Sequence, residues 1–192
     1  MDLISEEIIM INRRNFIIGV PVALAAISTV SPANATVYFT EATIRKSMFP
    51  TASQFIDRSL TLTPVQVKSI KKAASAFVLK NKVLVWDVMG ATGKIGTLFI
   101  DQVYGKHEFI TYALALGPDG EVTRIEVMDY RETYGEQVRN QNWRAQFSGK
   151  RYGQPIFLNK QIKNISGATL SCIHLTEGVR RLLATKALVL TA

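Results

Sequence analysis

Residues 165–171 read Ile165-Ser166-Gly167-Ala168-Thr169-Leu170-Ser171, a loop of small and polar residues directly before an amphipathic segment. From Ser171 to about Ala184, apolar residues recur at the spacing of a helix with one buried face. The first backbone N–H groups of a helix have no partner within the helix, and the helix dipole is positive at that end. The stretch therefore predicts a helix whose start can hold a phosphate group.

The segments upstream of this loop predict a sheet. Apolar, β-rich runs occupy residues 82–89, 95–104 and 108–116, and the turn sequence Gly117-Pro118-Asp119-Gly120 leads into a returning strand at 122–127. Short turns join these runs, without long helices between them. This arrangement favours an α+β fold with a mixed, mostly antiparallel sheet over a doubly wound parallel one.

Further helices are expected before and after these strands along the sequence. Thr63-Pro64 is an N-cap followed by proline at the first helical position, and it predicts an N-terminal helix over residues 64–79. Lys68, Lys71 and Lys72 would lie on its solvent side. A short helix is expected over residues 138–147, and residues 36–62 are expected to be irregular.

Several further motifs follow one another in a fixed order over about residues 90–185. They are the Asp119-Gly120 turn, Glu132-Thr133-Tyr134-Gly135, the stretch from Trp143 to Lys150, the loop at 166–171, and Thr176-Glu177-Gly178-Val179. Together they resemble the FMN-binding domain family. The resemblance implies an α+β domain that holds FMN at the start of its last helix, with the flavin attached from FAD by a separate flavin transferase that uses magnesium.

The same resemblance implies the residues of the cofactor site. In it, the hydroxyl of Ser171 carries the flavin phosphate, with Thr169 as the alternative acceptor and noncovalent binding as the alternative to a covalent bond. The implied cofactor-binding residues are Ser166, Gly167, Ala168, Thr169, Leu170, Ser171, Glu132 and Thr133. The first six form the phosphate loop, and Glu132 and Thr133 are expected near the isoalloxazine ring or in support of the loop.

The N-terminus is typical of an export signal. Arg13 and Arg14 precede an apolar stretch that ends at the cleavage-site sequence Ala33-Asn34-Ala35. The arginine pair followed by Phe16 resembles a twin-arginine signal, with an ordinary signal peptide as the alternative. We therefore expect residues 1–35 to be an export signal, residues 36–80 an N-terminal extension with a helix, and residues 81–192 the FMN-binding domain.

Composition limits the other classes of function. The chain has 192 residues, a net charge of +8, one cysteine and two histidines, so a disulfide, an iron–sulfur cluster or a histidine-rich metal site is not expected. Residues 1–35 hold two of the 23 basic and three of the 15 acidic residues, so the remainder carries +9. This charge favours phosphate groups or membrane surfaces, and no nucleic-acid-binding motif accompanies it.

Two other enzyme classes are disfavoured. Residues 90–96 contain glycines spaced as in a dinucleotide-binding turn, but a strand-like run follows where that fold needs a helix. No nucleophile, histidine and acid are placed to suggest a hydrolase. The expected function is electron transfer by FMN in the periplasm or another exported location, with association with a membrane. The expected partner is a quinone-linked membrane protein or a cytochrome, and the alternative is a noncatalytic FMN-binding module of a membrane redox complex.

Overall fold

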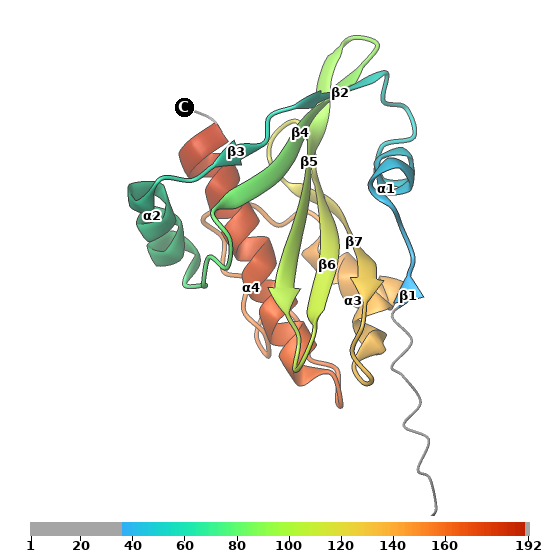
Figure 1. Ribbon diagram of the computed structural model, residues 1–192, viewed down its shortest axis with the longest axis vertical. Coiled ribbons are helices and arrows are strands. Elements are labelled where there is room, and N and C mark those ends of the chain that lie inside the picture. The colour runs from blue at the N-terminus through green and yellow to red at the C-terminus, as the bar shows by residue number, and fades with distance from the viewer. Residues whose placement is uncertain (1–35, 191–192) are drawn as a thin grey trace, which may run out of the picture. The chain divides into compact units, whose positions relative to one another are not determined.

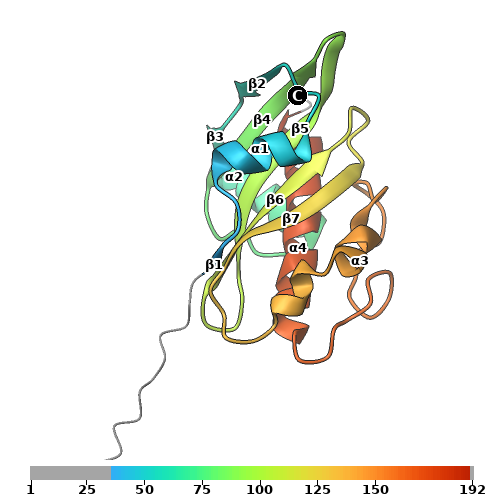
Figure 2. The same cartoon turned by 90° about the vertical axis from the view of Figure 1, so that its right-hand side faces the viewer.

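A seven-stranded antiparallel sheet with α-helices on both faces forms the centre of the structure (Figures 1 and 2). This computed structural model describes residues 36–190, so the predicted export signal lies outside the described residues. The predicted α+β fold, with an antiparallel sheet, an N-terminal helix and a C-terminal helix, is confirmed.

The sheet has the strand order β1-β7-β6-β5-β4-β2, and β3 also pairs with β4. All of these pairs are antiparallel. The strands are β1 (Thr36–Val37), β2 (Gln54–Asp57), β3 (Leu60–Thr61), β4 (Lys82–Gly90), β5 (Gly93–Tyr104), β6 (Phe109–Leu116) and β7 (Val122–Tyr130). The four long strands β4 to β7 follow one another as hairpins, as the short turns predict.

The helical elements are α1 (Glu41–Met48), α2 (Pro64–Ala74), η1 (Glu136–Arg139), α3 (Gln141–Arg144), η2 (Ala145–Phe147), α4 (Thr169–Thr185) and η3 (Lys186–Leu190). The helix predicted over residues 138–147 is therefore divided into three short helical segments, η1, α3 and η2. Of the helices that the structure describes, none combines the length and the apolar character needed to cross a lipid bilayer.

The glycines at 90–96 form a hairpin turn. Gly90 pairs with Gly93 at the end of the β4–β5 ladder, and Gly93 has a φ of 133°, which side-chain-bearing residues rarely adopt. Because β5 follows this turn, the dinucleotide-binding alternative is excluded, as the sequence indicates.

Each face of the sheet has its own core. On one face, α4 and α2 pack over Phe99, Tyr112 and Leu114, which are fully buried. On the other face, α1 covers Trp86 and Leu98 through its buried residues Ile44 and Met48. Figure 2 shows α1 in front of the strands and α4 behind them.

Two predictions for the N-terminal part are wrong. The segment expected to be irregular, residues 36–62, contains α1 and three short strands that pair with β7 or β4. The helix predicted over residues 64–79 ends at Ala74, because Ser75 takes a left-handed conformation with a φ of 47°. Phe77, which falls inside the predicted helix, lies beyond the observed end of α2 and is 68% exposed.

Candidate functional site

Helix α4 begins without a side-chain cap. Its N-cap is Ala168, and no side chain among residues 36–190 caps this end by a hydrogen bond. By contrast, helices α1 and α2 each begin with a threonine capping box, at Thr40 and Thr63. The first N–H groups of α4 are therefore available to a ligand, and the helix dipole adds positive potential there.

A cavity of about 420 Å³ lies at this helix start. Three separate segments line it: the turn between β5 and β6, the chain leaving β7, and the loop that leads into α4. Its lining residues are Lys106, His107, Glu132, Thr133, Tyr134, Gly167, Ala168, Thr169, Leu170 and Ser171. The structure thus brings Glu132 and Thr133 to the loop at 167–171, and of the candidate residues only Ser166 is outside the lining.

Gly167 shapes the open side of the loop. It has a φ of 83°, in the left-handed region, and a Cβ added there would meet no atom within 4 Å. The glycine is therefore needed for the conformation of the loop, and its α-carbon faces open space beside the helix start.

Glu132 closes the turn between β5 and β6. Its Oε1 accepts hydrogen bonds from the backbone N–H groups of His107 (2.6 Å) and Glu108 (3.0 Å). Burial alone would raise the pKa of Glu132, but these backbone donors and that of Lys106 outweigh it and lower the pKa below its ordinary value. The carboxylate therefore stays ionised and holds the wall of the cavity that carries Lys106.

A buried tyrosine holds the opposite wall. The hydroxyl of Tyr130, a residue only 3% exposed, donates to the carbonyl of Tyr134 (2.6 Å) and lies 3.2 Å from the hydroxyl of Ser171. A phenol has one proton, so the Ser171 hydroxyl is the donor in the second contact. Burial is the main cause that raises the pKa of Tyr130, so its proton stays in place at neutral pH.

The two candidate acceptor hydroxyls lie in different surroundings. Ser171 is 4% exposed, with its hydroxyl turned to Tyr130. Thr169 is exposed on the first turn of α4, and its Oγ1 accepts a hydrogen bond from the side-chain amide of Asn164 at 3.0 Å. A reagent entering the cavity from solvent therefore reaches Thr169 without moving a buried side chain.

Sequence reasoning missed part of this site. Lys106 and His107 were not among the candidates, because a basic turn between two strands carries no motif of its own. Tyr130 was assigned no role, since its hydroxyl contacts appear only when β7 and α4 are placed side by side. Tyr134 was quoted within the motif at 132–135, and it lines the cavity with 81% of its surface exposed.

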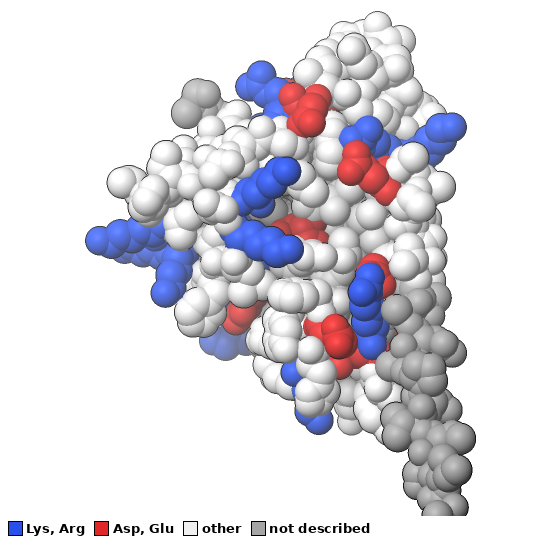
Figure 3. Space-filling model, viewed as in Figure 1, with Lys and Arg blue, Asp and Glu red and all other residues white. Residues whose placement is uncertain are grey.

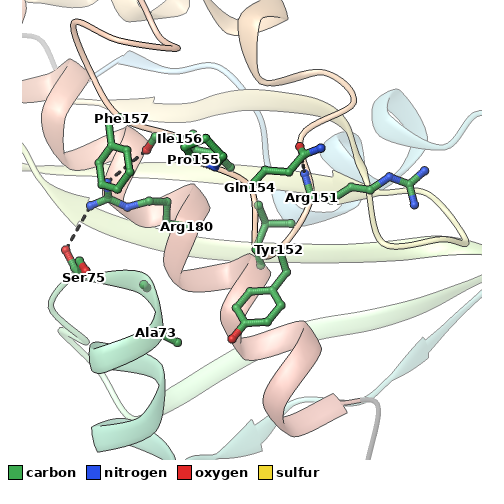
Figure 4. A pocket seen from close by; sticks show the side chains of 12 residues that line it. Ala73, Ser75, Arg151, Tyr152, Gln154, Pro155, Ile156, Phe157 and Arg180 are labelled. Carbon is green, nitrogen blue, oxygen red and sulfur yellow. Dashed lines mark hydrogen bonds between the residues drawn. The ribbon is translucent and has the colours of Figure 1, made fainter.

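A second cavity, of about 400 Å³, lies between the end of α2, the loop at 151–157 and α4. Figure 4 shows the guanidinium of Arg180 against the ring of Phe157, 4.6 Å from its centre, with hydrogen bonds to the carbonyls of Ile156 and Ser75. Arg180 thus ties this loop to α2. The two cavities are similar in size, and the uncapped helix start distinguishes the first.

Neither cavity is a metal site by composition. Within residues 36–190, no group of three or more histidine, cysteine, aspartate or glutamate side chains is arranged to hold a metal ion. Cys172, directly after the loop, is buried, and burial raises the pKa of its thiol, so it is a poor nucleophile.

A comparison with models of known protein families gives a match. Residues 105–184 match the family model described as the FMN-binding domain. The match begins at the turn that carries Lys106 and ends in the last turn of α4, so it contains every residue that lines the first cavity. A search of curated proteins finds no relative of this chain.

Proposed function

Because the chain contains an FMN-binding domain at residues 105–184, with FMN as its cofactor, we propose that it is an exported electron carrier with the flavin phosphate at the start of α4. The observation that carries the proposal is the cavity that combines this uncapped helix start with the residues around Glu132 and Thr133. Its volume of about 420 Å³ lies within the usual range of cofactor pockets.

The phosphate end of the site is formed by backbone and one cation. The N–H groups of the first turn of α4 supply donors, and Gly167 leaves space for oxygen atoms to approach them. Lys106 adds a positive charge from the facing turn, which Glu132 holds in place. A dianionic phosphate is stabilised by both, because each acts at short range in a partly enclosed site.

The ring end of the site is apolar and aromatic. Tyr134 and Leu170 line the cavity, with 81% and 42% of their surfaces exposed. The hydrogen bond from Tyr130 to the carbonyl of Tyr134 fixes the backbone that presents this ring. A planar isoalloxazine ring would cover both side chains and gain stacking against Tyr134.

For covalent attachment we favour Thr169 over Ser171 as the acceptor, because Thr169 is exposed at the cavity whereas Ser171 is buried against Tyr130. In the proposed reaction, catalysed by a flavin transferase, the threonine oxygen attacks the FMN phosphorus of FAD. An oxygen–phosphorus bond forms, the pyrophosphate bond breaks, AMP leaves, and the hydroxyl proton is released to solvent. The hydrogen bond from Asn164 to Oγ1 orients this hydroxyl and leaves its proton free to depart.

When bound, FMN supplies transfer of one or two electrons, and the chain's own residues position it and exclude water from one side. Since Glu132 is occupied by backbone N–H groups and Tyr130 keeps its proton, neither is a proton donor in turnover. A reacting partner would approach the cavity from solvent, on the side where Tyr134 is exposed. We propose a quinone-linked membrane protein or a cytochrome outside the cytoplasm as that partner.

The proposal is tested by expressing the full chain with and without a flavin transferase. Expected results are flavin fluorescence that survives denaturing electrophoresis with the transferase, and reduction and reoxidation of the bound flavin by membranes from the source cell. A protein that takes up no flavin from the transferase or from added FMN would contradict the site. A protein that binds flavin but exchanges no electrons would be a noncatalytic FMN-binding module instead.

A further inference from the structure

Positive charge is segregated in the chain around α2. Residues 58–86 contain six basic residues, Arg58, Lys68, Lys71, Lys72, Lys80 and Lys82, and no aspartate or glutamate. Helix α2 itself carries three of these lysines among its eleven residues and no acidic residue. Figure 3 shows the resulting group of blue side chains over α2, at the left of the view.

The outer face of α2 combines this charge with exposed apolar side chains. Ile70 and Ala74 point into the core, which places Val65, Lys68 and Lys72 on the opposite side of the helix. Val65 is 74% exposed, although an apolar side chain of this size is usually buried. We call Val65, Lys68, Lys71, Lys72 and Phe77 the α2 surface.

Phe77 extends the surface beyond the helix end. Its ring is 68% exposed and lies 4.8 Å from Nζ of Lys71, so the aromatic side chain and the lysines are contiguous. Within residues 36–190, none of Lys68, Lys71 and Lys72 forms an ion pair. Their charges are therefore uncompensated by the fold.

We propose that the α2 surface binds the protein peripherally to an anionic lipid membrane. Lysines beside large exposed apolar side chains are typical of helices that lie on an anionic bilayer, where the charges meet the headgroups and the apolar groups enter the interface. An acidic protein partner fits less well, because lysine is depleted in protein interfaces. The apolar face of α2 packs in the core of the protein, so only exposed side chains of the α2 surface enter the bilayer, and they insert shallowly. Binding therefore depends mainly on the lysines and weakens as the salt concentration rises.

The membrane surface is separate from the flavin site. None of the five residues of the α2 surface lines the cavity at the start of α4. Lipid binding and flavin binding can therefore be lost independently, and the failure of one proposal leaves the other standing.

The test places a fluorescent reporter on the α2 surface of the full chain. The native residues Trp86 and Trp143 are 4% and 5% exposed, so their emission gives a constant background. A Phe77→Trp variant is expected to shift to the blue, and to be quenched by brominated lipid, with phosphatidylglycerol vesicles and not with phosphatidylcholine vesicles. Because the reporter is local, binding through residues 1–35 alone leaves it unchanged. If Phe77→Trp fails to fold, Val65→Trp serves as the reporter.

Charge-matched variants identify the surface. Each lysine is expected to contribute about fivefold to the affinity for anionic vesicles. The triple variant Lys68→Gln, Lys71→Gln and Lys72→Gln is therefore expected to bind these vesicles about 100-fold more weakly. A control with Lys46→Gln, Lys150→Gln and Lys163→Gln, which removes the same charge outside the α2 surface, is expected to bind within a fewfold of the parent. Both variants should keep the parent's flavin content and unfolding midpoint.

Three results would overturn the proposal. One is the absence of a shift on anionic vesicles, and another is a shift that the first triple variant leaves unchanged. The third is a shift produced by an acidic polypeptide such as polyglutamate and not by vesicles, which would make the surface a site for acidic proteins.

Discussion

Replacing Gly135 with alanine is expected to cost about 3–4 kcal/mol of folding free energy, because the residue lies against the hydroxyls of Tyr130 and Ser171 beside the cavity at the start of α4. Its φ of 95° is unfavourable for a residue with a side chain, at a cost of about 1–2 kcal/mol. The added Cβ would also lie 2.5 Å from Oη of Tyr130 and 3.1 Å from Oγ of Ser171. Moving the tyrosine breaks its hydrogen bonds to Tyr134 and Ser171, at about 1 kcal/mol each.

The controls separate backbone strain from the clash. Gly153 has a φ of 85° and open space around its α-carbon, so Gly153→Ala should cost the strain alone, about 1–2 kcal/mol. In a Tyr130→Phe background the hydroxyl is gone, and Gly135→Ala should cost no more than this control. Urea unfolding followed by fluorescence of the buried tryptophans gives all four values. Equal costs for Gly135→Ala and Gly153→Ala would refute the proposed contact between Tyr130 and the start of α4.

Three further substitutions test other parts of the account. Glu132→Gln should lower the free energy of unfolding at neutral pH. The pKa of Glu132 in the folded state is below its ordinary value of 4.5. The ionised carboxylate therefore stabilises the fold above pH 4.5, and this stabilisation is lost as the pH falls through the folded-state pKa. Urea unfolding at neutral pH and well below pH 4.5 should show the deficit shrinking; a deficit independent of pH would contradict the charge-based role. Tyr134→Leu should weaken noncovalent FMN binding about fivefold in a fluorescence titration, and unchanged affinity would remove the stacking contact. Thr63→Ala should cost about 1 kcal/mol in urea unfolding through loss of the α2 capping box, with no change in flavin content.

The long hairpins and the last helix were predictable because each is encoded locally. Alternating or continuous apolar runs separated by glycine turns predict β4 to β7 to within a few residues, and the small-residue loop predicts the start of α4. The turn at 117–120 closes as expected, with the Gly120 N–H donating to the Gly117 carbonyl at 3.0 Å.

The N-terminal elements were not predictable from local pattern, since they depend on partners far away in the chain. Each strand before residue 62 is at most four residues long and exists through pairing with β4 or β7. Helix α1 begins with a capping box in which Thr43 replaces the usual glutamate or glutamine, so its sequence signal is weak. The end of α2 at Ser75 follows from a left-handed residue that is not glycine, which sequence patterns seldom reveal.

The residues of the candidate site also differ in whether a local sequence pattern reveals them. The loop at 166–171 carries its chemistry in a contiguous motif, and the motif at 132–135 pointed to the facing wall. Lys106 lies in the β5–β6 turn, and Tyr130 meets the loop through its contact with Ser171, so only the structure relates these residues to the loop. Burial of Ser171, which bears directly on the choice of acceptor, is likewise a property of the fold.

The most direct test of the central claim is the intact mass of the full chain after co-expression with a flavin transferase. The parent and Ser171→Ala are expected to carry one added FMN, and Thr169→Ala is expected to carry none while keeping its fold. An FMN increment on Thr169→Ala that Ser171→Ala lacks would show that the buried hydroxyl is the acceptor. The absence of any increment on the parent would contradict covalent attachment at the start of α4.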